Sequence, residues 1–301
     1  MSIKVESAKW KGKTGGGNFG QKFIVFLFKH FNLRIGYGIM YFIMPFYFVF
    51  GCKARKSVLK YLRKALGFGG INAICKAWKI YVNFAKIMLD RFSVFAGHGK
   101  EFKITENNVN IFDQYTSKEK GFILLGSHTG SFELCGYLLH QNQKKIYTLV
   151  YGGEGGYLTE NRTKVLNKNN IIPIAITNDM QHLFTINQAL DNGNIVSLAA
   201  DRILGSNKSK ELDFLNAKAD FPIGPFATAS IKDVDVLAVF AFRTGYCKYE
   251  VNVFKIEKDL NYQTLNNKLK AESLMKKYVE VLESQVRKYP LQWFNFYDYF
   301  K

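Results

Sequence analysis

A histidine and a glutamate five residues apart follow a short apolar run that could form a buried strand. The run 122–125 leads into a turn that contains His128, and Glu133 falls in the first turn of the helix expected to follow. Ligands of α/β sheets bind at the carboxyl ends of strands, where His128 would lie. Glu133 can accept a hydrogen bond from one imidazole nitrogen and leave the other free to act as a base. The spacing predicts a general-base pair; an exposed histidine beside an unrelated helix-start carboxylate is the alternative.

The elements that must position this pair alternate between strands and helices. Short apolar runs, typical of strands buried on both faces, are separated by stretches of helical character. This order predicts an α/β fold with a mostly parallel mixed sheet flanked by helices. Asp201 and Arg202 follow one such strand, so we expect them at the same edge of the sheet as His128. The predicted strands cover 102–105, 121–126, 145–151, 171–177, 194–199, 234–243 and 248–256, and the predicted helices cover 109–115, 132–141, 158–167, 180–191, 226–232 and 268–289.

Spacing argues against several other chemistries. Gly15, Gly17 and Gly20 fit a GxGxxG pattern, but no apolar strand precedes them and no acidic residue follows at the distance that a dinucleotide site needs. The chain contains no GxSxG nucleophile motif of the α/β serine hydrolases. Its four cysteines form no CxxC pair and have no histidines at ligand spacing. We therefore expect no dinucleotide cofactor, no metal site and no disulfide framework.

The charge of the chain is concentrated near its N-terminus. The 301 residues carry 42 Lys and Arg against 24 Asp and Glu, a net charge of +18. Residues 1–64 hold 13 of these basic residues and a single acid, Glu6. A region this basic predicts a polyanionic partner, either a nucleic acid or an anionic membrane surface. Hydrophobic residues make up 48% of the chain, which excludes a disordered protein.

An uncharged stretch in the same region predicts a membrane anchor. Residues 35–52 lack charge, but they fall slightly short of the about 20 residues of a spanning helix, and Pro45 would kink or break such a helix. Residues 54–66 repeat apolar side chains at helical spacing with basic residues on the other face, as in a helix lying in the membrane interface. We expect a monotopic or re-entrant anchor on the cytoplasmic leaflet; a buried aromatic helix of a soluble core is the alternative.

The pattern of residues along the sequence changes near Gly97. Aromatic and basic helical stretches precede it, ending with a predicted helix over 71–95, and the strand pattern begins after it. We therefore divide the chain into an N-terminal membrane-associating helical region, 1–97, and an α/β domain, 98–301.

Short motifs along the chain resemble those of one enzyme superfamily. The HxxxxE motif of His128 and Glu133 is similar to the HxxxxD/E motif of the glycerolipid and lysophospholipid acyltransferases, and the chain most resembles the bacterial lipid A biosynthesis (lauroyl/myristoyl) acyltransferases. No other motif would suffice alone, but together they occur in order over nearly the whole chain. They are Trp10 with Gly12 and 14–16, then 61–63, 90–91, 161–162, 201–202, 221–226, Arg243 and 290–298.

The resemblance implies transfer of an acyl group from an acyl carrier protein or coenzyme A thioester to a hydroxyl or amine of a lipid. A lipid A precursor is the leading acceptor, and a lysophospholipid or an aminoacyl lipid are alternatives. A thioester needs no enzyme nucleophile, so His128, held by Glu133, would only remove the acceptor's proton. The amides of Gly130 and Ser131 would stabilise the oxyanion, and Arg162 would bind the acceptor's phosphate.

Asp201 and Arg202 would shape the same cleft. The lipid A enzymes often carry Asp-Gln where this chain has Asp201 and Arg202, which leaves room for a different preference for acceptor or donor. The proline-bearing block 221–225 is expected to form a wall of the acyl channel. No cofactor is implied beyond the thioester co-substrate, and the implied location is the cytoplasmic face of the cell inner membrane.

Two functions from other classes compete with this interpretation. A nucleic-acid-binding protein would explain the basic charge, but that charge lies beside apolar stretches too long for a soluble basic arm, and no nucleic-acid-binding motif is present. A non-catalytic membrane scaffold on the same fold is disfavoured because His128 and Glu133 are both intact.

Overall fold

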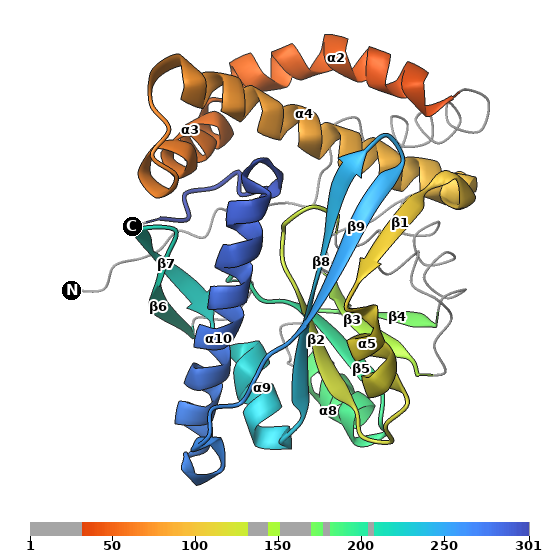
Figure 1. The fold of residues 1–301 in the computed structure, drawn as a ribbon, viewed down its shortest axis with the longest axis vertical. Helices are drawn as coiled ribbons and strands as arrows, with labels where there is room; N and C mark the ends of the chain where they lie inside the picture. The colour runs from red at the N-terminus through yellow and green to blue at the C-terminus, as the bar shows by residue number, and fades with distance from the viewer. Residues whose placement is uncertain (1–31, 132–143, 151–169, 177–180, 204–207, 301) are drawn as a thin grey trace.

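A mostly parallel sheet forms the centre of the computed structural model, which describes residues 32–131, 144–150, 170–176, 181–203 and 208–300 (Figure 1). Its strands are β1 (Lys103–Asn107), β2 (Phe122–Gly126), β3 (Ile146–Val150), β4 (Ile171–Ala175), β5 (Ile195–Ala199), β8 (Asp235–Gly245) and β9 (Lys248–Lys255). They lie in the order β1-β9-β8-β2-β5-β3-β4. The strands from β8 to β4 run parallel, and β9 and β1 run in the opposite direction. The predicted fold class is confirmed.

Helices cover the sheet and account for its buried strands. Every residue of β2 is buried, which explains its uninterrupted apolar sequence. The helices α9 (Gly224–Lys232) and α10 (Asn267–Lys288) pack together, and α9 also contacts β2. The helix α8 (Gln181–Asp191) packs against β4 and β5, and α5 (Val109–Thr116) packs against β9. The helices predicted over 132–141 and 158–167 lie outside the described residues.

A two-stranded hairpin lies beside α10 and was not expected from the sequence. Its strands β6 (Ser209–Phe214) and β7 (Ala217–Pro222) are antiparallel, and Leu215 and Asn216 join them with φ values of 52° and 62°. Charged side chains occupy the exposed face of β6, so the segment lacks the apolar run that reveals the other strands. The block 221–225 therefore ends a strand and begins α9, which starts at Gly224.

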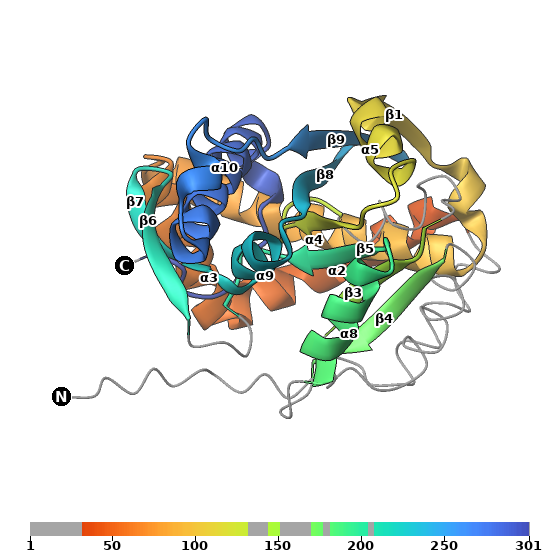
Figure 2. The same cartoon turned by 90° about the horizontal axis from the view of Figure 1, so that it is seen from below.

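Three helices form a layer across one end of the sheet. The helix α2 (Leu33–Phe50) lies beside α4 (Gly70–Phe95), and α3 (Cys52–Lys60) with a π-helical turn (Tyr61–Ala65) connects them (Figure 1). Seen from below, this layer lies behind the strands (Figure 2). Pro45 lies inside α2 without ending it, so the expected break does not occur. At the C-terminal end of α2, Arg55 Nη1 donates to the carbonyls of Phe48 at 2.7 Å and Val49 at 2.9 Å.

The outer side of α2 is apolar and exposed. The helix is the one element in the described part of the chain that is long and apolar enough to cross a membrane, yet Leu33, Met40 and Met44 are buried, so one of its sides packs within the protein. Its exposed side carries Phe42 at 80%, together with other large hydrophobic residues. These are Ile35, Ile39, Tyr41, Ile43, Phe46, Tyr47, Val49 and Phe50.

The apolar side of α3 and the turn after it points into the protein instead. Val58 is 1% exposed and Leu62 is fully buried. The sequence pattern of 54–66 had the form of an interfacial helix, but its apolar residues pack on the protein core rather than facing a membrane. That part of the prediction is wrong, because periodicity alone cannot tell which apolar partner a helix meets.

A buried polar cluster connects α2, α4 and the sheet. Asp90 of α4, whose side chain is completely buried, forms an ion pair with Arg243 of β8 at 3.0 Å. The carboxylate also accepts hydrogen bonds from Tyr249 of β9 at 2.6 Å and from Tyr37 of α2. Arg243 Nη2 donates to the Tyr37 hydroxyl at 3.1 Å. The cluster therefore crosses residue 97, where the division into two regions remains a prediction.

Candidate active site

The turn after β2 is fixed from several sides. The Gly126 carbonyl accepts hydrogen bonds from the buried Tyr278 hydroxyl of α10 at 2.8 Å and from the Ala200 amide at 3.1 Å. The hydroxyls of Ser127 and Thr129 lie 2.7 Å apart, and both residues are buried. Parallel pairing of β2 with β5 aligns Gly126 with Ala199, so the residues that follow the two strands meet.

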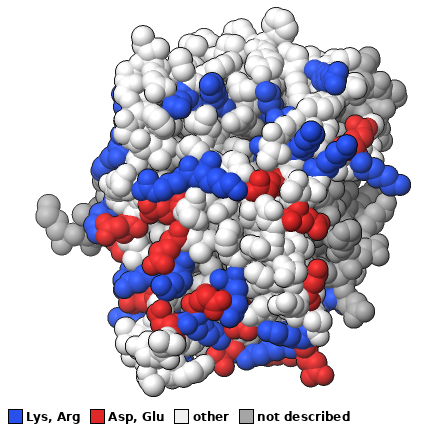
Figure 3. All heavy atoms as spheres, in the orientation of Figure 1, with Lys and Arg blue, Asp and Glu red and all other residues white. Residues whose placement is uncertain are grey.

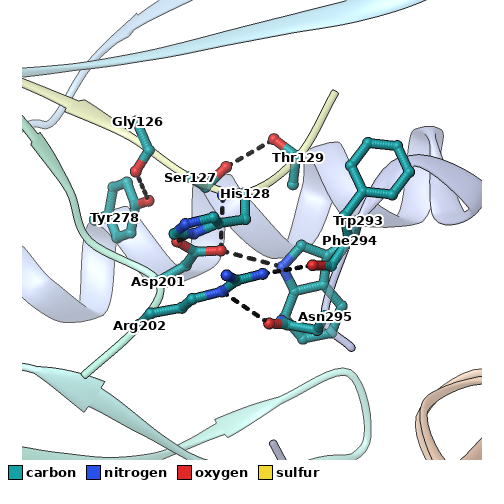
Figure 4. A network of polar contacts seen from close by, with 10 residues as sticks. All are labelled: Gly126, Ser127, His128, Thr129, Asp201, Arg202, Tyr278, Trp293, Phe294 and Asn295. Carbon is teal, nitrogen blue, oxygen red and sulfur yellow. Dashed lines mark hydrogen bonds and ion pairs between the residues drawn. The ribbon is translucent and has the colours of Figure 1, made fainter. Parts of the chain in front are cut away.

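His128 and Asp201 form the centre of this site (Figure 4). The imidazole Nδ1 lies 2.7 Å from Asp201 Oδ1, and the His128 backbone N–H donates to Oδ2 at 2.9 Å. The His128 side chain is 32% exposed and that of Asp201 is completely buried. A carboxylate that accepts a hydrogen bond from Nδ1–H leaves Nε2 unprotonated, so the partly exposed imidazole can act as a base.

The electrostatics of Asp201 favour its ionised form. Burial alone would raise its pKa, but the charge and hydrogen bonds of His128, with a smaller contribution from Arg202, lower the pKa to about 2. Ionised Asp201 therefore stabilises the folded protein above its ordinary pKa of 3.8, and this contribution is lost as the pH falls towards about 2. At neutral pH the site contains a carboxylate able to stabilise an imidazolium ion.

The C-terminal segment forms a second wall of the site. Trp293 Nε1 donates to Asp201 Oδ2 at 3.3 Å. An antiparallel bridge pairs Trp293 with Thr129, in which the Phe294 amide donates to the His128 carbonyl at 2.9 Å. The sequence offered no partner for Trp293, because the contact joins residues 92 positions apart.

Arg202 lies beside this wall. Its Nε donates to Asn295 Oδ1 at 3.2 Å, its Nη2 donates to the Phe294 carbonyl, and its guanidinium lies 5.2 Å from the Tyr297 ring centroid. Asn295 is 3% exposed, and its Nδ2 has no hydrogen-bond partner in the described structure. The fixed cation of Arg202 next to the histidine could bind an anionic group of a substrate.

The amides of Gly130 and Ser131 are already used. Gly130 N–H donates to the Gln292 carbonyl at 2.6 Å, and Ser131 N–H donates to the Ala241 carbonyl at 2.7 Å. Their expected role as oxyanion donors is therefore not supported by the geometry; the two residues instead attach the turn to its neighbours. Glycine is required at 130, where φ is 53° and a Cβ atom would lie 1.9 Å from the Ala241 oxygen.

Two of the predicted site residues, Glu133 and Arg162, lie outside the described residues. Among the described ones, the structure brings His128 together with Asp201 and places Arg202 beside them. The position at Nδ1 that the HxxxxE spacing predicts for Glu133 is occupied by Asp201. The sequence indicated only that Asp201 follows a strand at the same sheet edge; the contact itself depends on the pairing of β2 with β5.

The proline-bearing block borders a groove of about 520 Å³. Ile223, Ala227 and Ile231 line it along α9, with lysines from β6 and α10 at its edge. None of its lining residues belongs to the cluster around His128, so its expected role as a wall of the acyl channel stays a prediction. Within the described ranges, no three His, Cys, Asp or Glu side chains are grouped to hold a metal ion.

The chemistry available at this site is general-base catalysis by His128 Nε2, with Asp201 stabilising the positive charge that develops.

A sequence model of the family described as bacterial lipid A biosynthesis acyltransferase matches residues 75–301. A comparison with individual curated proteins gives no match. The match spans the strands of the sheet, the His128 turn and the C-terminal wall.

Proposed function

Because the chain belongs to the bacterial lipid A biosynthesis acyltransferase family, we propose that it moves a fatty acyl group from a thioester to a hydroxyl of a lipid A precursor, with His128 as the general base. The observation that carries this assignment is the contact between His128 Nδ1 and a fully buried carboxylate, which leaves Nε2 of the partly exposed imidazole to react. The donor is the thioester of an acyl carrier protein or of coenzyme A.

In the proposed reaction the acceptor hydroxyl attacks the thioester carbonyl carbon while His128 Nε2 removes its proton. The tetrahedral intermediate then collapses, the carbon–sulfur bond breaks, and the thiolate takes the proton from the imidazolium. One ester forms and one thioester is lost, so no oxidant, metal or enzyme nucleophile is needed. Asp201 stabilises the imidazolium throughout without accepting the proton.

Three further residues are proposed for substrate binding or positioning. Arg202 lies beside the base and would stabilise the developing oxyanion or a substrate phosphate. Arg162 is proposed as a ligand of the acceptor's phosphate from its motif. Glu133 is retained as a site residue from its motif, with the role at Nδ1 assigned to Asp201.

We propose that α2 binds the membrane by lying in its interface. One side of the helix packs within the protein along its length, and the other side exposes large aromatic residues. Asp90 is the single acid between residues 33 and 95, and it is completely buried. Figure 3 shows scattered Lys and Arg among mostly uncharged atoms, and no Asp or Glu, in the uppermost part of this face, over this helical layer. Aromatic side chains beside basic ones fit an anionic leaflet, and the proposed location is the cytoplasmic face of the inner membrane.

The alternatives fit these observations less well. A lysophospholipid or an aminoacyl lipid remains compatible with the base, but the matched family favours a lipid A precursor. A nucleic-acid-binding protein would not need exposed Phe42, Phe46 and Phe50 on the outer side of its basic layer. A scaffold would not need an oriented, exposed imidazole on a buried carboxylate.

The test is acyl transfer by the full-length protein in detergent, with a lipid A precursor as acceptor and either an acyl carrier protein or coenzyme A thioester as donor. His128→Ala should lower the rate at least about 10²-fold, the typical contribution of a general base. His98→Ala is the matched control, since His98 pairs with Glu101 at the surface. Near wild-type turnover by His128→Ala would contradict the mechanism.

A further inference from the structure

The buried carboxylate of Asp201 is held by three donors, one of which comes from the C-terminal segment. Oδ1 faces His128 Nδ1, while Oδ2 accepts both the His128 amide and the Trp293 indole N–H. An indole N–H can only donate, so it cannot exchange roles with the carboxylate or take up a proton. The indole N–H therefore favours the ionised form of Asp201 and holds its carboxylate in one orientation.

Trp293 is itself fixed by its surroundings. It is 1% exposed, and the rings of Tyr61, Phe214 and Tyr299 lie edge-on to it at centroid distances of 5.0, 5.3 and 4.9 Å. The backbone on both sides of Trp293 pairs with the His128 turn, through Gln292 and Phe294. The indole thus has a single position relative to Asp201, as a group that orients another must have.

We propose that Trp293 is a positioning residue for acyl transfer. Its indole N–H holds Asp201 Oδ2 so that Oδ1 meets His128 Nδ1, and the carboxylate cannot rotate away when the imidazole becomes charged. A fully buried carboxylate depends on such donors, because no water replaces a lost one. The role rests on the proposed function, since it requires His128 to be the base.

Trp293→Phe removes the N–H and keeps a ring in the cluster. We expect kcat to fall about tenfold, the order expected for one hydrogen bond to a charged group, with KM for donor and acceptor unchanged. The matched control is Tyr61→Phe. It removes a hydroxyl that donates to the Pro290 carbonyl at 2.8 Å in the same aromatic cluster, without touching Asp201. The kcat of Tyr61→Phe should stay at the wild-type value, while its melting temperature should fall about as far as that of Trp293→Phe.

Equal kcat values for Trp293→Phe and Tyr61→Phe would overturn the proposal, as would a rise in KM without a fall in kcat. If Trp293→Phe does not fold, 3-benzothienylalanine at position 293 keeps the shape of the indole and replaces N–H by sulfur; it should show the same tenfold loss. The His128→Ala result separates the two proposals. An active His128→Ala refutes the proposed function, whereas an inactive one with full activity in Trp293→Phe refutes only the role of Trp293.

Discussion

At the scale of single residues, the site depends on which carboxylate holds the imidazole. The motif His128 to Glu133 is visible in the sequence because its members are five positions apart, and the placement of Asp201 at the same sheet edge could be predicted from strand order. Their direct contact could not be predicted, because it depends on the pairing of β2 with β5. The sequence indicated even less clearly that Trp293 and Asn295 lie at the site, since aromatic and amide residues near a C-terminus more often pack in the core.

Asp201→Asn tests the orientation of the base. An asparagine amide can donate to Nδ1 and so place the proton on Nε2, which would leave no free base. We expect kcat to fall about 10³- to 10⁴-fold with the fold retained, by analogy with a serine protease triad in which the same replacement gives the wrong tautomer. The measurement is steady-state transfer beside a thermal melt. Asp298→Asn, which alters an exposed ion pair with Lys60, is the control, and nearly full activity of Asp201→Asn would refute the assigned role.

At the scale of elements, apolar runs identified the central strands β2, β5 and β8 because most of their residues are buried, whereas β1 at the edge of the sheet is largely exposed. The hairpin of β6 and β7 was missed for the converse reason, since one of its faces is charged and exposed. Periodicity found the helix that begins at Cys52 but not what its apolar side meets. Pro45 shows a further limit: a proline costs a helix one hydrogen bond, and a helix supported along one side by α4 continues through it.

The cluster around Asp90 should carry much of the attachment between the helical layer and the sheet. Arg243→Met leaves the buried Asp90 carboxylate without its cation, and we expect the free energy of unfolding to fall by about 3 to 5 kcal/mol. Adding Asp90→Asn should restore a large part of this loss, because a neutral amide still accepts the hydrogen bonds of Tyr37 and Tyr249. Denaturant unfolding in detergent measures both.

The control for this cluster is the ion pair of Lys232 with Asp191, in which the aspartate is 62% exposed. Lys232→Met should cost less than about 1 kcal/mol, as exposed ion pairs usually do. A loss of equal size in Arg243→Met and Lys232→Met would mean that the buried cluster does not hold the layer to the sheet.

At the scale of the whole molecule, apolar burial and charge should act together in membrane binding. Fully burying an aromatic side chain contributes roughly 1.5 to 3 kcal/mol, so the exposed side of α2 should hold the protein on membranes when salt screens its basic residues. We expect membrane-bound protein to resist a high-salt wash and to require detergent. Replacing Phe42, Phe46 and Phe50 by serine should make binding sensitive to salt.

The readout is sedimentation with vesicles containing anionic lipid, at low and high salt, for the wild type and the triple variant. Replacing the exposed Phe184 of α8 by serine is the control, because it removes a similar aromatic residue outside the helical layer. Release of the wild-type protein by salt alone would show that binding is a surface-charge contact and that α2 does not enter the lipid.

The ion pair of Asp90 and Arg243 also bears on the distance between the helical layer and the His128 turn. Arg243 lies on β8, two residues beyond Ala241, whose carbonyl accepts the N–H of Ser131 in the turn after β2. With α2 in the interface as proposed, the same strand would join the lipid surface to the His128 turn and would keep the distance between them constant. An acceptor would then have to leave the leaflet by that distance to reach His128. The protein would then select among the hydroxyls of one lipid by their depth in the leaflet, before it recognises the shape of the acceptor.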